Sequence, residues 1–89
     1  MSITVCSVCG ESAEKACPVG DFDDLKCPHC GRYSVNRKLI EEMTAMRQRF
    51  HILRTQQYLA IHSRSGRVPA LDRLEATIHE LIVASPRHI

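Results

Sequence analysis

The second half of the chain places apolar residues at the spacing of an amphipathic helix. From Arg37 to about Ser63 the sequence has neither glycine nor proline, and Asn36 is a residue type that commonly caps the start of a helix. Apolar residues recur there at steps of four and three, as on one helical face. They are Leu39, Met43, Met46, Phe50, Leu53 and Ala60, with Gln57 as the polar member of the series. The pattern predicts one long helix over about residues 36–63.

A second apolar face follows a turn. Residues 63–68 have the composition of a turn, and Pro69 suits the first position of a helix. A helix from about Pro69 to Ala84 would share an apolar face made of Leu71, Leu74, Ile78, Leu81 and Ile82. Because the connection is short, we expect the two helices to form an antiparallel hairpin.

The predicted second helix is too short to cover the whole of the first. At 1.5 Å per residue the long helix would span about 40 Å, so the apolar face of its N-terminal half needs another cover. This seam comprises Leu39, Ile40, Met43, Met46 and Phe50. It can pack on the N-terminal part of the chain, on a second copy in a homodimer, or on a different protein.

The first third of the chain carries two Cys-x-x-Cys-Gly sequences. Two cysteines separated by two residues can direct both sulfurs at one ion, and Zn²⁺ takes four sulfur ligands in a tetrahedron at roughly 2.3 Å. Gly10 and Gly31 follow the second cysteine of each pair. They suit sharp turns that point backbone N–H groups at the sulfurs. The sequence predicts one structural zinc ion per chain, held by Cys6, Cys9, Cys27 and Cys30.

Disulfide and redox roles for these cysteines are the alternatives. The five cysteines are an odd number, whereas a disulfide framework in a secreted domain favours an even number. The first residues lack the pattern of a signal peptide, so we expect a cytoplasmic protein with reduced thiols. Cys27-Pro28-His29-Cys30 resembles thioredoxin-superfamily motifs at these four residues alone. A strand-like segment follows them instead of the helix that such a motif opens.

Two further residues are spare candidate ligands. A lone cysteine such as Cys17 is more often a small buried apolar group. His29 lies inside the second turn, where its side chain should point away from the metal. We expect neither residue to coordinate zinc.

With their flanking β-type segments, the two cysteine pairs resemble the zinc-ribbon class over about residues 3–35. The Cys-Pro-x-Cys-Gly-x-Tyr sequence that ends at Tyr33 is similar to the ribbons that open many small prokaryotic and phage proteins. A treble clef is disfavoured because residues 33–35 favour a strand over a helix. The expected fold is therefore a small α+β zinc-binding domain, with a zinc ribbon in residues 1–35 and the helical hairpin in residues 36–89.

Charge is distributed unevenly along the chain. The formal net charge is only +2, yet residues 1–31 carry two lysines against five acidic residues, and residues 32–67 carry eight basic residues against two acidic ones. Arginine dominates the basic part, and its planar guanidinium suits bidentate contact with phosphate or carboxylate. The candidate contact residues are Arg32, Arg37, Lys38, Arg47, Arg54, Arg64 and Arg67.

Enzymatic activity has no support in the sequence. A metal held by four thiolates offers no open position for water or substrate, and the chain has no phosphate-binding glycine loop or nucleophile motif. It also has no long apolar run for a membrane and no sign of a small-molecule site. We expect a non-catalytic regulatory or accessory protein that associates with nucleic acid or with a nucleic-acid-processing complex. The alternative is a protein-binding inhibitor or adaptor of phage or mobile-element type, which resembles anti-CRISPR proteins in size and architecture.

Overall fold

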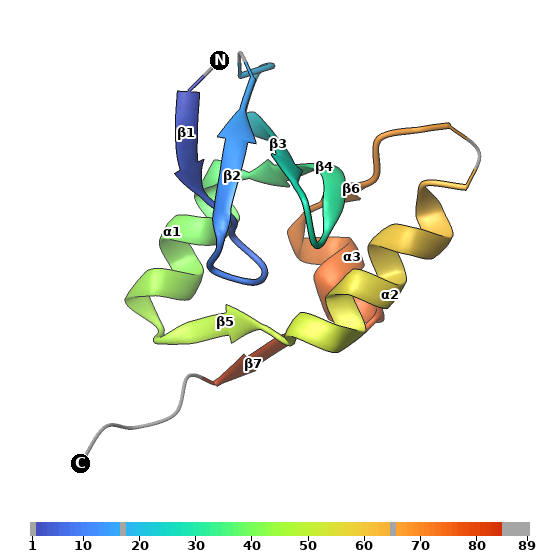
Figure 1. Cartoon of the computed structure of the whole chain (residues 1–89). Coiled ribbons are helices and arrows are strands. Elements are labelled where there is room, and N and C mark those ends of the chain that lie inside the picture. Colours follow the sequence, from blue (N-terminus) through green and yellow to red (C-terminus); the bar gives the residue numbers. More distant parts are fainter. Residues whose placement is uncertain (1, 17, 65, 85–89) are drawn as a thin grey trace.

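The computed structural model describes residues 2–16, 18–64 and 66–84. Its fold begins with four successive strands. They are β1 (Ser2–Val5), β2 (Ser12–Lys15), β3 (Phe22–Cys27) and β4 (Gly31–Asn36). Each pairs antiparallel with the next, and the short strand β6 (Ala70–Leu71) then adds parallel to β4 (Figure 1). The C-terminal part of the chain therefore contributes a strand to the sheet that the N-terminal part begins.

Three short helices and a second, two-stranded sheet complete the fold. The helices are α1 (Arg37–Ala45), α2 (Ile52–His62) and α3 (Arg73–Ile78), and the small sheet pairs β5 (Gln48–Phe50) with β7 (Ile82–Ala84). One face of the main sheet buries Leu25, Tyr33 and Val35, which share a single core with Leu39 and Leu59 of the helices. None of the helices in the described part of the chain is long and apolar enough to cross a bilayer.

Each helix begins at a polar side chain that accepts a hydrogen bond from the first turn. The acceptors are Asn36 for α1, His51 for α2 and Asp72 for α3. These caps satisfy N–H groups that a helix leaves without an internal partner. The cap at Asn36 agrees with the sequence, whereas the other two mark helix starts that the apolar pattern did not predict.

The predicted long helix over residues 36–63 is wrong. Helix α1 ends at Ala45, and Arg47 takes a left-handed conformation with φ 54°. The chain then enters β5, where Phe50 pairs with Ile82 and is completely buried. Pairing with β7 supplies backbone hydrogen bonds that replace those of a continuous helix, and this tertiary contact outweighs the local helical periodicity.

The predicted second helix over residues 69–84 is also wrong, and with it the antiparallel two-helix hairpin. Residues 70–71 form β6, Asp72 caps the six-residue helix α3, and Glu80 reverses the chain with φ 52°. Ile82 and Val83 then lie in β7, in keeping with the strand preference of β-branched side chains.

The predicted apolar seam is divided between the core and the surface. Leu39, Met43 and Phe50 are buried within the chain's own core, Ile40 is half-buried, and Met46 is 64% exposed. The three buried residues of the seam thus pack within the chain itself, in its single core. They are therefore not available as a dimer surface.

Candidate metal centre

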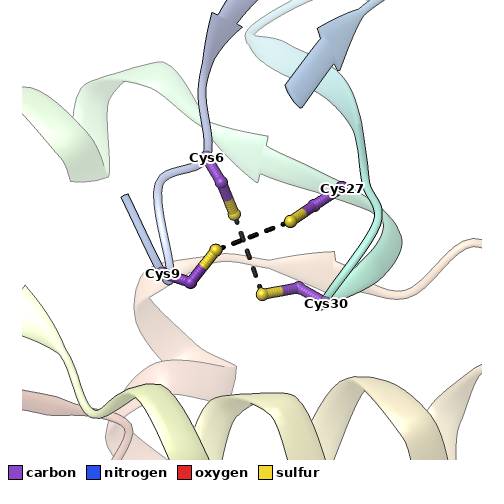
Figure 2. Close-up of side chains that lie close together, drawn as sticks. All are labelled: Cys6, Cys9, Cys27 and Cys30. Atoms are coloured by element: carbon purple, nitrogen blue, oxygen red, sulfur yellow. Dashed lines mark hydrogen bonds between the residues drawn. The ribbon is translucent and has the colours of Figure 1, made fainter. Parts of the chain in front are cut away.

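The four cysteines of the two Cys-x-x-Cys-Gly sequences converge at one point (Figure 2). Cys6 and Cys9 belong to the turn between β1 and β2, while Cys27 ends β3 and Cys30 immediately precedes β4. Two antiparallel hairpins thus each present a pair of sulfurs. Cys6, Cys27 and Cys30 are buried and Cys9 is half-buried, so the site lies largely out of water.

The distances between the sulfurs suit a tetrahedral ion. All four Sγ atoms lie within 4.8 Å of one another, with Cys6 and Cys30 at 3.8 Å and Cys9 and Cys27 at 3.5 Å. A tetrahedron with metal–sulfur bonds of roughly 2.3 Å has edges of about 3.8 Å. A disulfide would need a separation of about 2.05 Å, so these are free thiols. The four residues can hold a metal ion.

The two turns have equivalent geometry. Gly10 and Gly31 have φ values of 80° and 86°, a conformation that disfavours any side chain. The backbone N–H of Val8 donates to Cys6 Sγ and that of His29 donates to Cys27 Sγ, each at 3.4 Å. Backbone donors thus face the sulfurs as expected, although they come from the residue two positions after the first cysteine of each pair.

Tyr33 adds a donor from the core of the sheet. Its hydroxyl lies 3.0 Å from Cys6 Sγ, and the backbone N–H of Ser7 donates to the same oxygen at 3.0 Å. Because Ser7 uses a lone pair of the oxygen, the hydroxyl proton is free to point at the sulfur. Tyr33 is completely buried, so its ring and the Ser7 contact fix the position of this donor.

Gln56 connects the site to the helices. Its side-chain Nε2 donates to Cys30 Sγ at 3.4 Å from helix α2, whose ribbon passes beside the four sulfurs in Figure 2. Neither Tyr33 nor Gln56 was among the predicted site residues. The spacing of Tyr33 from Gly31 offered a signal, whereas Gln56 lies 26 residues from Cys30 on a helix whose limits were mispredicted.

The local environment changes the pKa values of the thiols in opposite directions. Burial disfavours the Cys6 thiolate, but hydrogen bonds from backbone N–H groups and from Tyr33 outweigh it and lower the pKa of Cys6 to about 7. Burial and then the negative charge of Cys6 raise the pKa of Cys30. A cation between the sulfurs supplies the opposite charge that lets all four ionise, so metal binding is coupled to release of protons.

Two of the candidate basic contacts are already engaged with carboxylates. Arg32 makes two hydrogen bonds to Asp24, at 2.7 and 3.2 Å. Arg37 contacts Asp23 at 2.9 Å and also donates to the carbonyl of Gly20. These pairs hold β3 to β4 and to the start of α1.

The other candidate contacts lie farther along the chain. Arg54 on α2 donates to the carbonyl of Glu80. The remaining candidates make no ion pair with any residue in the described ranges, and all have exposed side chains. They are Lys38, Arg47, Arg64 and Arg67. Arg49, on β5, is exposed in the same way.

The two spare candidate ligands have different outcomes. His29 is exposed, and the cluster of sulfurs does not include it. Cys17 lies outside the described residues.

The fold and the site thus define a small α+β domain with a cluster of four cysteines that could hold a metal ion. Comparison of the chain with protein-family models, with curated proteins and with solved structures finds no match.

Proposed function

We propose that the protein is a non-catalytic binding module that a structural Zn²⁺ ion stabilises and that binds nucleic acid through the arginines of residues 47–67. Two antiparallel hairpins that each present a Cys-x-x-Cys pair are the arrangement expected of a zinc ribbon, and four sulfurs fill the tetrahedral shell of zinc. With no ligand position left open, the ion serves structure and not catalysis.

The observation that carries the nucleic-acid proposal is a run of 29 residues, 43–71, with no aspartate or glutamate. We call it the acid-free segment. It contains five arginines, at positions 47, 49, 54, 64 and 67. Arginines without carboxylate partners keep their hydrogen-bonding capacity for an external anion, and phosphate accepts the planar guanidinium in bidentate fashion.

The placement of the aromatic residues indicates what kind of nucleic-acid contact this is. Tyr33, Phe50 and Tyr58 are buried, and Phe22, the fourth aromatic residue, is half-buried. Single-stranded bases are usually held by exposed aromatic rings on which they stack. We therefore propose contact with the phosphate backbone, which carries little sequence information and depends strongly on salt.

The test is fluorescence anisotropy with labelled duplex DNA and RNA at low and at moderate salt concentration. We expect binding that weakens steeply as the salt concentration rises. We also expect Arg47→Glu and Arg49→Glu each to weaken binding several-fold. Lys26→Glu is the matched control, because Lys26 is equally exposed but lies on β3 in the N-terminal sheet. No binding at low salt, or an equal loss for Lys26→Glu, contradicts the proposal.

A protein-binding adaptor or inhibitor is the second candidate, and one observation favours it. Leu53 and Ile61 are exposed on helix α2, and a phosphate backbone offers no cover for such side chains. A protein surface does.

A further inference from the structure

Helix α2 carries apolar side chains on two opposite faces. Thr55, Tyr58 and Leu59 face the core and are buried. Leu53 and Ile61 lie on the opposite side, where they are 61% and 58% exposed. A helix that covers a core usually presents polar residues to water on its outer side, and a helix with apolar residues on both sides is usually covered on both.

The exposed residues form a continuous stripe. Positions 53, 57, 60 and 61 follow one another at helical spacing on the outer face of α2, so Gln57 and Ala60 lie between Leu53 and Ile61. We call these four residues the outer stripe. Ala60 is small enough for another helix to approach closely beside it, and Gln57 adds no charge to the stripe.

The outer stripe has basic residues at both ends. Arg54 lies next to Leu53 at the start of α2, where it also donates to the Glu80 carbonyl, and Arg64 lies two residues after the end of the helix at His62. The helix itself contains no acidic residue, and neither does the rest of the acid-free segment. The stripe is thus uncharged along its length, with an arginine near each of its two ends.

We propose that the outer stripe docks an acidic amphipathic helix of a protein partner. The partner's apolar face would cover Leu53 and Ile61, and its carboxylates would bind the guanidinium groups of Arg54 and Arg64. The eleven residues of α2 are about 16 Å long at 1.5 Å per residue. That length matches about three turns of a partner helix.

The charge pattern decides between this partner and the two other occupants. A second copy would bring a stripe with basic ends against an identical one, and like charges oppose such a pairing. Nucleic acid would satisfy the arginines but would leave Leu53 and Ile61 in water. An acidic helix satisfies both features at once. The proposed nucleic-acid contact is tested at Arg47 and Arg49, which lie outside the stripe and its flanking arginines, so the two proposals can fail separately.

The experiment measures binding of the zinc-loaded full chain to three fluorescent helical peptides of about 18 residues, or five turns. The first presents leucines on one face with glutamates beside them, the second replaces the leucines with serine, and the third replaces the glutamates with lysine. We expect the first peptide to bind at least about tenfold more tightly than either of the others, because only it matches both features of the stripe.

Paired variants of the protein then locate the contact. Leu53→Ser with Ile61→Ser should weaken binding of the leucine–glutamate peptide at least about tenfold and leave nucleic-acid affinity unchanged. Leu74→Ser with Ile78→Ser is the matched control, because these residues of α3 are 65% and 61% exposed and lie outside the stripe. Arg54→Glu with Arg64→Glu should reverse the preference toward the lysine peptide.

Three results would overturn the inference. Equal binding of all three peptides would do so, as would equal losses from the α2 and α3 variants. A dimer in light scattering that the Leu53→Ser and Ile61→Ser pair dissociates would assign the stripe to a second copy instead. Circular dichroism of each variant shows whether the fold is retained, and loss of peptide binding counts only in a variant that keeps it.

Discussion

The N-terminal hairpins and the acid-free segment differ in whether their arginines form ion pairs. In the hairpins, Asp24 is bound to Arg32 of β4, and Asp23 is bound to Arg37 at the start of α1. In the acid-free segment, Arg47 and Arg49 have no ion-pair partner within the ranges that the structure describes, and apolar side chains are exposed beside the arginines. We infer that the paired arginines help to hold the fold together, whereas the exposed Arg47 and Arg49 keep their donors for an external anion.

The cysteine sulfurs of the hairpins also have hydrogen-bond donors within the chain. Each hairpin turn supplies a backbone N–H to a cysteine, and Tyr33 of β4 and Gln56 of α2 supply two more donors. The polar groups around the metal centre are thus directed inward. We infer that changes in the hairpins alter stability and metal affinity, and that changes at the exposed arginines of the acid-free segment alter binding with little effect on stability.

Removal of the metal should have the largest effect on the hairpins. Structural zinc contributes an apparent binding free energy of about 10–16 kcal/mol in small domains, more than the total stability of most folds of this size. We expect a strong chelator, or Cys27→Ser, to abolish the cooperative thermal transition seen by circular dichroism. Native mass spectrometry should show one zinc ion per chain before chelation. A metal-free chain that melts at the same temperature would contradict the structural role.

The next largest effect on stability is expected at Phe50. This residue and Leu53 share one face of the predicted long helix, but the observed strand β5 separates their environments. Phe50 is completely buried and Leu53 is 61% exposed. Phe50→Ala should lower the free energy of unfolding by about 3–5 kcal/mol, whereas Leu53→Ala should change it by less than about 0.5 kcal/mol. Urea denaturation of the two variants measures both values. Similar losses would indicate that both residues belong to one buried face.

The same pair of residues shows where prediction from the sequence ends. The four cysteines and their glycines lie within short segments whose local chemistry is sufficient to indicate a metal site. The helix break at Arg47 depends on pairing of β5 with β7, and its residues lie more than thirty positions apart, as Phe50 and Ile82 do. Apolar residues at helical spacing therefore predicted a continuous helix where the chain forms two helices and a strand.

Some of the missed structure did leave a local signal. Asp72 and Glu75 have the spacing of a helix N-terminal capping pair, and Asp72 accepts the hydrogen bond from the Glu75 backbone. That signal competes with Pro69, which suits the start of an earlier helix. By contrast, the contact from Gln56 to Cys30 has no signature in the sequence, because it depends on how α2 packs beside the hairpins.

Tyr33→Phe should have an intermediate effect and should act on the metal. The change removes the hydroxyl donor to Cys6 and the acceptor for the partly buried Ser7 N–H. We expect zinc affinity to fall about 10–100-fold, as measured by competition with a chromophoric chelator. Tyr58→Phe is the matched control, because Tyr58 is also buried but its hydroxyl contacts Glu75. An equal loss of affinity in both variants would show that the effect comes from general destabilisation.

The smallest expected effect is that of Arg32→Gln. This change tests whether an arginine that is already paired in the hairpins contributes to stability and not to nucleic-acid binding. Arg32 and Asp24 form a two-bond pair, but the Arg32 side chain is 58% exposed, so solvent and salt screen the attraction. The loss should be under about 1 kcal/mol in the free energy of unfolding and smaller at high salt. Nucleic-acid affinity should stay near that of the unmodified protein, because the guanidinium already satisfies Asp24, whereas Arg49→Gln should weaken binding without a change in stability. If Arg32→Gln weakens nucleic-acid binding as much as Arg49→Gln does, the hairpins share the contact surface and the division between the two regions fails.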